Sequence, residues 1–189
     1  MTEMSMVEKA RKFAYQAHDG QKRKGKDTPY IVHPCEVAEI LEQAGCRPEV
    51  ICAGWLHDTV EDTGTTLDVI AREFGNFVAE LVAWCTEDKR GTWEERKKHT
   101  ICLLESQEIP RDAMMVICAD KLSNLRSLSR DYQVVGEKLW ERFRRPKEYQ
   151  GWYYGAIQER MGSLRDTFIY QEYKDLYQQV FQYQEAVCK

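Results

Sequence analysis

The sequence contains little of what marks unusual protein classes. Its 189 residues include only 11 glycines and 5 prolines, with 43% hydrophobic and 31% charged residues. This composition excludes collagen-like, low-complexity and intrinsically disordered chains. The apolar runs are far too short to span a membrane, and the first residues mix acids and bases without an apolar core. We therefore expect neither a membrane anchor nor a signal peptide.

Closely spaced cysteines and an excess of positive charge are also missing. The seven cysteines never form a Cys-x-x-Cys pair, which excludes zinc-ribbon and thioredoxin-type sites. Several lie among apolar residues, so we expect buried, reduced thiols and a cytoplasmic protein. The net charge is -4. Because general nucleic-acid binders are usually basic, this value argues against nucleic acid as a partner.

The spacing of apolar residues is helical along nearly the whole chain. Residues 113–119 are apolar on every helical face, which predicts a segment at the centre of the domain. No convincing strand pattern with a period of two occurs. We predict helices over ranges that include 4–18, 92–107 and 171–188. Thr92 followed by Glu95 predicts a capping box at the start of the second. The fold class is therefore predicted to be all-α, a bundle of about eight to ten helices forming one domain over 1–189.

Ligand-type side chains occur at three separated places: His33, the doublet His57-Asp58, and Asp120. Imidazole and carboxylate groups together are typical ligands of divalent metal ions in hydrolytic sites. Two of each leave coordination positions open for water and substrate. Asp120 follows the apolar run 113–119, where a carboxylate is costly unless it is paired or bound to a cation.

Each of these residues also has an ordinary explanation. A single histidine on an amphipathic helix is usually a packed or surface residue, and His33 fits the start of a helix. Asp120 fits a buried ion pair with Lys121 or Arg126. The joint pattern, more than any single residue, favours a metal centre.

Four longer motifs carry a family resemblance. The chain resembles the HD-domain metal-dependent phosphohydrolases, in particular the hydrolase domain of the RelA/SpoT alarmone enzymes and most of all the small stand-alone alarmone hydrolases. The resemblance spans about residues 10–130 and fades beyond them. The matching stretches are AHDGQKRK at 17–24, PYIVHP at 29–34, LHDTVEDT at 56–63 and ADKLSNLR at 119–126.

The resemblance implies a metal centre, usually holding manganese, although another divalent ion would suit the same residue types. Its implied reaction is hydrolysis of the 3′-pyrophosphate from guanosine tetra- or pentaphosphate, which gives GDP or GTP and pyrophosphate. The implied metal ligands are His33, His57, Asp58 and Asp120.

The same resemblance implies roles for residues around the metal. Glu61 and Asp62 match an acidic pair that orients and deprotonates the attacking water. They follow the His-Asp doublet by four positions each, so both pairs share a face if that helix continues. Arg23 and Lys24 match a basic pair that faces the nucleotide, and Asn124 matches a substrate contact. The alternative for the acidic pair is a solvated helix end.

Two further features are open to more than one interpretation. The segment 22–26 holds four basic residues, and a second basic stretch occupies 142–147. Either suits a polyanionic substrate, yet such runs are usually solvated surface. Beyond residue 130 lie 13 of the 21 aromatic residues. The aromatic stretch 140–154 is a candidate lining of the nucleoside pocket, but a core or lid packed against the first helices is the preferred interpretation.

We therefore expect a motif-bearing part at about 1–130 and an aromatic-rich part at 131–189, with a nucleotide polyphosphate as substrate. The alternatives are an HD phosphohydrolase acting on another nucleotide or phosphorylated metabolite, a nucleotide-binding sensor without turnover, and a helical scaffold without a ligand. The sequence does not indicate an oligomeric state.

Overall fold

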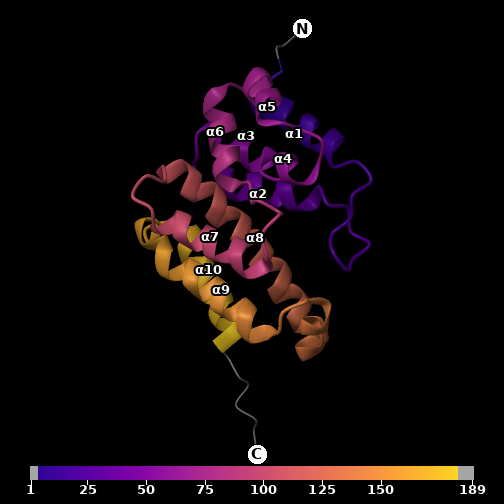
Figure 1. Ribbon diagram of the computed structural model, residues 1–189, viewed down its shortest axis with the longest axis vertical. Coiled ribbons are helices and arrows are strands. Elements are labelled where there is room, and N and C mark those ends of the chain that lie inside the picture. The colour runs from indigo at the N-terminus through magenta and orange to yellow at the C-terminus, as the bar shows by residue number, and fades with distance from the viewer. Residues whose placement is uncertain (1–3, 183–189) are drawn as a thin grey trace, which may run out of the picture.

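The computed structural model describes residues 4–182, and almost all of their regular structure is helical (Figure 1). In this part of the chain the only β-type pairing is one isolated bridge between Lys22 and Pro29. The predicted all-α fold class is confirmed. The α-helices are α1 Met6–Ala17, α2 Val32–Gln43, α3 Pro48–Leu56, α4 Thr59–Asp62, α5 Leu67–Phe74, α6 Asn76–Cys85, α7 Trp93–Glu105, α8 Arg111–Val135, α9 Lys147–Arg160 and α10 Phe168–Tyr177.

Local capping explains where several helices begin. Before α7, the Thr92 hydroxyl accepts the Glu95 N–H and the Glu95 carboxylate accepts the Thr92 N–H, so the predicted capping box is present. Ser5 and Glu8 form the same box at α1. The last helix, predicted at 171–188, begins earlier and passes into the π-helical turn η3 Gln178–Gln182. The remainder of that prediction, 183–188, lies outside the described residues.

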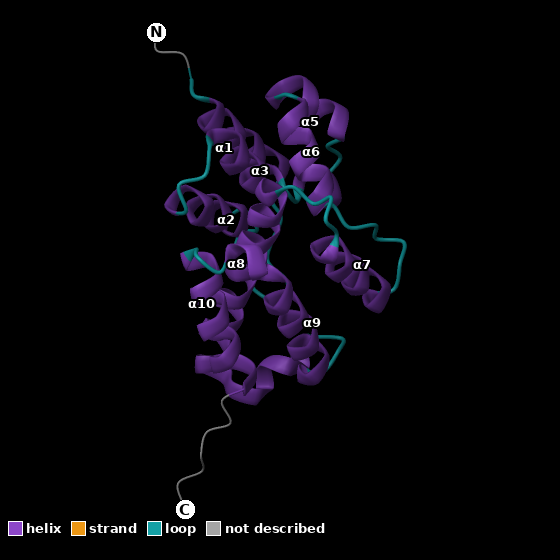
Figure 2. Cartoon of the chain, turned by 90° about the vertical axis from the view of Figure 1, so that its left-hand side faces the viewer, coloured by secondary structure: helices purple, strands orange, loops and turns teal. Residues whose placement is uncertain are grey.

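Helix α8 is the central element of the bundle. It packs against α2, α3 and α6 on one side and α10 on the other, and Figure 2 shows α2, α8 and α10 following one another down the molecule. All residues of the apolar run 113–119 are buried, as the sequence predicted. Asp120 comes directly after this run, so α8 carries a carboxylate into the middle of the fold.

The aromatic residues after 130 mostly pack against one another. The Tyr154 and Phe181 rings stack with centroids 5.7 Å apart, and Trp140 lies 5.4 Å from Phe181. The Tyr173 hydroxyl, fully buried, donates to the Tyr154 carbonyl at 2.9 Å. This region, which includes the short 3₁₀ helices η1 Gly136–Arg142 and η2 Met161–Leu164, therefore forms a second layer of core beneath α8.

Two other expectations concern membrane-spanning helices and the cysteine thiols. Among residues 4–182, no helix combines the length and apolarity needed to cross a membrane. Cys52 and Cys118 are buried, whereas Cys102 is exposed. The expectation of buried thiols therefore holds for only some of the cysteines.

Candidate active site

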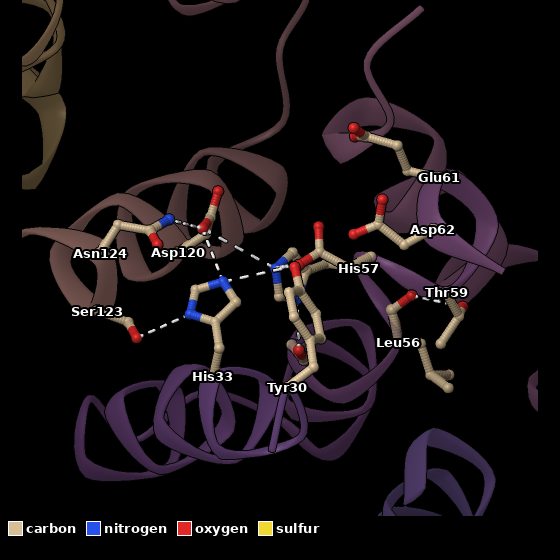
Figure 3. A network of polar contacts seen from close by, with 12 residues as sticks. Tyr30, His33, Leu56, His57, Thr59, Glu61, Asp62, Asp120, Ser123 and Asn124 are labelled. Carbon is tan, nitrogen blue, oxygen red and sulfur yellow. Dashed lines mark hydrogen bonds and ion pairs between the residues drawn. The ribbon is translucent and has the colours of Figure 1, made fainter. Parts of the chain in front are cut away.

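Three helical segments bring the predicted metal ligands together (Figure 3). His33 comes from the first turn of α2, His57 and Asp58 from the junction of α3 and α4, and Asp120 from α8. One ligand atom each of His33, His57 and Asp58 lies within 4.8 Å of the others. Asp120 Oδ1 is 3.1 Å from His33 Nε2 and 3.9 Å from His57 Nε2. Side chains separated by up to 87 positions therefore converge on one point.

The helix that precedes His57, α3, does not continue through Glu61 and Asp62. It ends at Leu56, and a new short helix begins at Thr59. Two side chains occupy the carbonyls that a continuing helix would use: His57 Nδ1 lies 2.8 Å from the Gly54 carbonyl, and the Thr59 hydroxyl donates to the Leu56 carbonyl at 2.7 Å. Such local hydrogen bonds compete with the helical ladder. The condition under which both residue pairs would share one helical face is therefore not met.

The hydrogen bonding of His57 fits a metal ligand. A backbone carbonyl only accepts, so Nδ1 carries the imidazole proton. The Nε2 lone pair then points at Asp58 Oδ2, 3.0 Å away, and Nε2 has no hydrogen-bond partner among the described residues although His57 is only 2% exposed. Two acceptors that face each other at this distance, largely shielded from water, need either a shared cation or a second proton on the imidazole. The donor set therefore fits a divalent metal ion.

The electrostatics show the same demand for positive charge. Burial lowers the pKa of His57, but the Asp58 and Asp120 carboxylates raise it more, to about 9. Burial dominates at His33 and lowers its pKa. Burial acts to raise the pKa values of Asp58 and Asp120. The two histidines nevertheless hold the pKa of Asp58 well below its usual range, and Lys121 together with the histidines does the same for Asp120. The centre therefore favours ionised carboxylates facing a cation or an imidazolium.

Glu61 and Asp62 lie on α4, in Figure 3 on the opposite side of the centre from Asn124. Lys89 donates to Asp62, and its Nζ lies 3.7 Å from Glu61 Oε1. Glu61 Oε2 also accepts the Glu87 N–H at 3.2 Å. Burial, which outweighs that hydrogen bond, raises the pKa of Glu61. A carboxylate with a raised pKa beside a metal-type cage suits proton transfer.

A cavity of about 230 Å³ lies next to this centre. The predicted substrate residues line it, and Asn124 joins it to the centre: Asn124 Nδ2 donates to Asp120 Oδ1 at 2.6 Å, while its Oδ1 accepts from Arg23 at 2.8 Å. The cavity is lined by Arg23, Lys24, Lys26, Tyr30, Asn124, Ser127, Leu128, Asp131, Leu139, Arg142, Phe143 and Tyr154.

The second basic stretch, 142–147, divides between two roles. Arg142 lines the cavity and pairs with Asp131 at 3.1 Å. Arg145 pairs with Glu94, and Lys147 pairs with Glu137. Only the start of the stretch therefore faces the cavity, while Arg145 and Lys147 form ion pairs away from it.

Sequence reasoning missed Tyr30, whose hydroxyl donates to Asp58 Oδ2 at 2.6 Å. Tyr30 lies within a motif stretch, which was the available signal. The ion pair of Asp120 with Lys121 that the sequence offered is present, because Lys121 donates to Asp120 Oδ2 at 2.6 Å. Phe143 and Tyr154 form cavity walls, although no sequence pattern separates them from the packed aromatics around them.

Comparison with known proteins agrees with this geometry. A model of the HD domain family matches residues 10–145. Over 135 residues the chain is 43% identical to the guanosine-3′,5′-bis(diphosphate) 3′-pyrophosphohydrolase MESH1 of Homo sapiens, covering 68% of this chain and 73% of the human protein. Over 124 residues it is 37% identical to a guanosine-3′,5′-bis(diphosphate) 3′-pyrophosphohydrolase of Aquifex aeolicus, covering 65% of this chain but only 18% of that protein.

Two solved structures share the fold. The protein lmo0812 of Listeria monocytogenes superposes with a TM-score of 0.74 at 40% identity, covering 80% of this chain and 99% of that one. A metazoan orthologue of SpoT, described as hydrolysing ppGpp, superposes with a TM-score of 0.75 at 28% identity, covering 95% and 97%. Sequence, fold and ligand geometry agree, and the chain belongs to the HD domain family.

Proposed function

We propose that this chain is a metal-dependent hydrolase that removes the 3′-pyrophosphate from guanosine 3′,5′-bis(diphosphate)-type alarmones. The products are GDP or GTP and pyrophosphate. The human and Aquifex relatives carry the name of this activity. The observation that carries the proposal is the bridge of Asn124, which connects the proposed metal ligand Asp120 to the basic wall of the adjacent cavity.

His33, His57, Asp58 and Asp120 are the residues that would hold the metal. Manganese is our preferred ion, because the family resemblance implies it, although another divalent ion fits the same imidazole and carboxylate donors. When bound, such an ion acts as a Lewis acid on a phosphoryl oxygen and lowers the pKa of water. The positions of the two histidines are held by hydrogen bonds to their Nδ1 atoms.

Glu61 is our proposed base. Its carboxylate is partly buried, and its pKa is raised by that burial, so it can take a proton from the attacking water near neutral pH. Asp62 orients that water. Lys89 contacts both acids and keeps them from repelling each other while substrate is absent.

The basic wall of the cavity binds the substrate. The Arg23 guanidinium lies 5.6 Å from the centre of the Tyr30 ring and hydrogen-bonds to Asn124, so it is oriented before a ligand arrives. Arginine offers both a planar face for a purine and donors for phosphate. Lys24, exposed at the rim, supplies a further charge for the diphosphates.

One observation keeps a second candidate substrate class open. Part of the cavity wall, Leu139 to Tyr154, comes from the region where the motif resemblance ends. Another nucleotide or a phosphorylated metabolite is therefore the alternative substrate. The Glu61–Asp62 pair argues against a sensor without turnover. We further propose that the chain forms a single domain, because α8 crosses residue 130 and contacts helices that precede it in the sequence as well as helices that follow it. Cytoplasmic localisation stays a prediction.

The test is a substrate panel. Purified protein with Mn²⁺ is incubated with 3′-pyrophosphorylated nucleotides and with ordinary nucleoside di- and triphosphates, and pyrophosphate and orthophosphate are measured separately. We expect pyrophosphate from the 3′-pyrophosphorylated guanosine compounds. Failure to cleave any 3′-pyrophosphate would refute the proposal, and cleavage of ordinary nucleotides alone would favour the alternative.

A further inference from the structure

A buried hydroxyl, itself bonded to a carboxylate, contacts the imidazole of His33 on the side that faces away from the proposed metal centre. The Ser123 hydroxyl, on α8, lies 2.9 Å from His33 Nδ1, the nitrogen that faces away from the centre. Glu36 Oε2, on α2, lies 2.6 Å from the same hydroxyl. Ser123 is 1% exposed and His33 4%, and Figure 3 shows Ser123 on the side of His33 that points away from His57.

The proton positions in this chain of contacts follow from donor counting. A serine hydroxyl has a single proton, and a carboxylate only accepts. Ser123 therefore donates to Glu36, and its oxygen is left to accept. The remaining neighbour, His33 Nδ1, must then donate, so the His33 proton lies on Nδ1 and the Nε2 lone pair faces the centre.

Two arginines keep Glu36 ionised, which this direction requires. Glu36 Oε1 lies 3.2 Å from Arg130 and 3.7 Å from Arg126. Burial raises the pKa of Glu36, but the hydrogen bonds from Ser123 and Arg130 and the two positive charges lower it more. Arg126 in turn donates two hydrogen bonds of 2.6 Å to Glu172 of α10. The network thus runs from the C-terminal region to the imidazole.

We propose that Ser123 is a positioning residue that fixes the tautomer and orientation of His33 for metal binding, with Glu36 fixing the direction of the Ser123 hydroxyl. The Nδ1 atom of His57 is held in the same way by a backbone carbonyl, that of Gly54. His33 depends instead on a side chain, so a point mutation can remove its support. This inference rests on the proposed function, because it assumes that His33 binds a divalent ion.

The experiment compares two variants of equal shape, Ser123→Val and Ser123→Thr, in the full chain. Threonine keeps the hydroxyl and valine replaces it with a methyl group. Mn²⁺ affinity is measured by calorimetry, and the imidazole tautomer by nitrogen NMR of the Mg²⁺-loaded protein, which is diamagnetic. We expect Mn²⁺ to bind Ser123→Val about 10- to 100-fold more weakly than Ser123→Thr. We also expect Ser123→Val to lose the single Nδ1–H tautomer at His33.

Ser129→Ala is the matched control for packing. Ser129 is buried on the same helix, and its hydroxyl bonds to Gln179, not to a histidine. Equal Mn²⁺ affinity in Ser123→Val and Ser123→Thr would overturn the inference. So would a loss of Mn²⁺ affinity in Ser129→Ala as large as that in Ser123→Val. If the two branched variants do not fold, Ser123→Ala is compared with Ser129→Ala by the same criteria. Absence of Mn²⁺ binding by the unaltered chain would refute the proposed metal centre itself.

Discussion

The two regions of this molecule use their buried side chains differently. Before residue 130, polar side chains from α2, from the junction of α3 and α4, and from α8 point at one another across the fold, as His33 and Asp120 do at 3.1 Å. After residue 130, buried aromatic rings fill space, and a hydroxyl such as that of Tyr173 is satisfied by a backbone carbonyl. The first region therefore places charged groups next to one another, and the second provides a packed aromatic core.

The cavity lies where the two regions meet. Its charged wall comes from the loop around Arg23, and its apolar wall from Leu139, Phe143 and Tyr154. We infer that the first region determines the chemistry and that the second determines which nucleoside fits. Variants in the two regions should therefore fail in different ways.

The largest effect is expected at the metal centre. Asp58→Ala removes a carboxylate that faces both histidines, so Mn²⁺ binding should be lost. Turnover should fall by at least about a thousandfold, since metal stabilisation of the transition state is worth several kcal/mol. Calorimetry and a pyrophosphate assay check this. Retained Mn²⁺ affinity in Asp58→Ala would show that the centre lies elsewhere.

A smaller loss is expected for the proposed base. Glu61→Gln keeps the size of the side chain but cannot accept a proton, so turnover should fall on the order of a hundredfold. Mn²⁺ affinity should stay unchanged, because Glu61 lies outside the proposed ligand set. Exposed Glu108→Gln serves as control. Unchanged turnover in Glu61→Gln would remove this residue from the mechanism.

The second region should affect binding rather than turnover. Phe143→Ala removes an aromatic wall of the cavity, so KM should rise about fivefold while kcat changes little, since a ring contact is worth about 1 kcal/mol. Trp152→Ala is the matched control, because Trp152 is 44% exposed and does not line this cavity. A fall in kcat with unchanged KM would contradict the division of roles between the regions.

The smallest effect on turnover is expected for an acid that links the two regions. Glu87 accepts from Lys97 at 2.8 Å, and Lys97 lies 4.9 Å from the centre of the Tyr153 ring. Burial raises the pKa of Glu87, but Lys121, Lys97 and Arg96 lower it more. Its stabilising contribution is therefore present above the unfolded-state pKa of about 4.3 and lost as pH falls through the lower folded value.

Glu87→Gln should accordingly lower the free energy of unfolding at neutral pH by about 1–3 kcal/mol, and the difference from the unaltered protein should shrink in acid. Denaturant unfolding at a series of pH values measures this. A difference that is constant with pH would show that Glu87 contributes through packing instead of charge.

The sequence predicted the helical class and the start of α7, because capping and apolar spacing are local. It also indicated the ligand residue types through motif resemblance. It could not predict the break after Leu56, which depends on whether His57 and Thr59 bond to backbone carbonyls. Nor could it identify Ser123 or Phe143 as parts of the site, since their roles come from neighbours 90 and more positions away or from the folded shape of the cavity.

The central claim is that water attacks the 3′-linked phosphorus at a centre built by the first region. Its most direct test is hydrolysis of guanosine 3′,5′-bis(diphosphate) with Mn²⁺ in water labelled with heavy oxygen, followed by mass spectrometry of both products. We predict equal amounts of GDP and pyrophosphate, with the label in the pyrophosphate alone. Label in the GDP, or release of orthophosphate in place of pyrophosphate, would contradict the account.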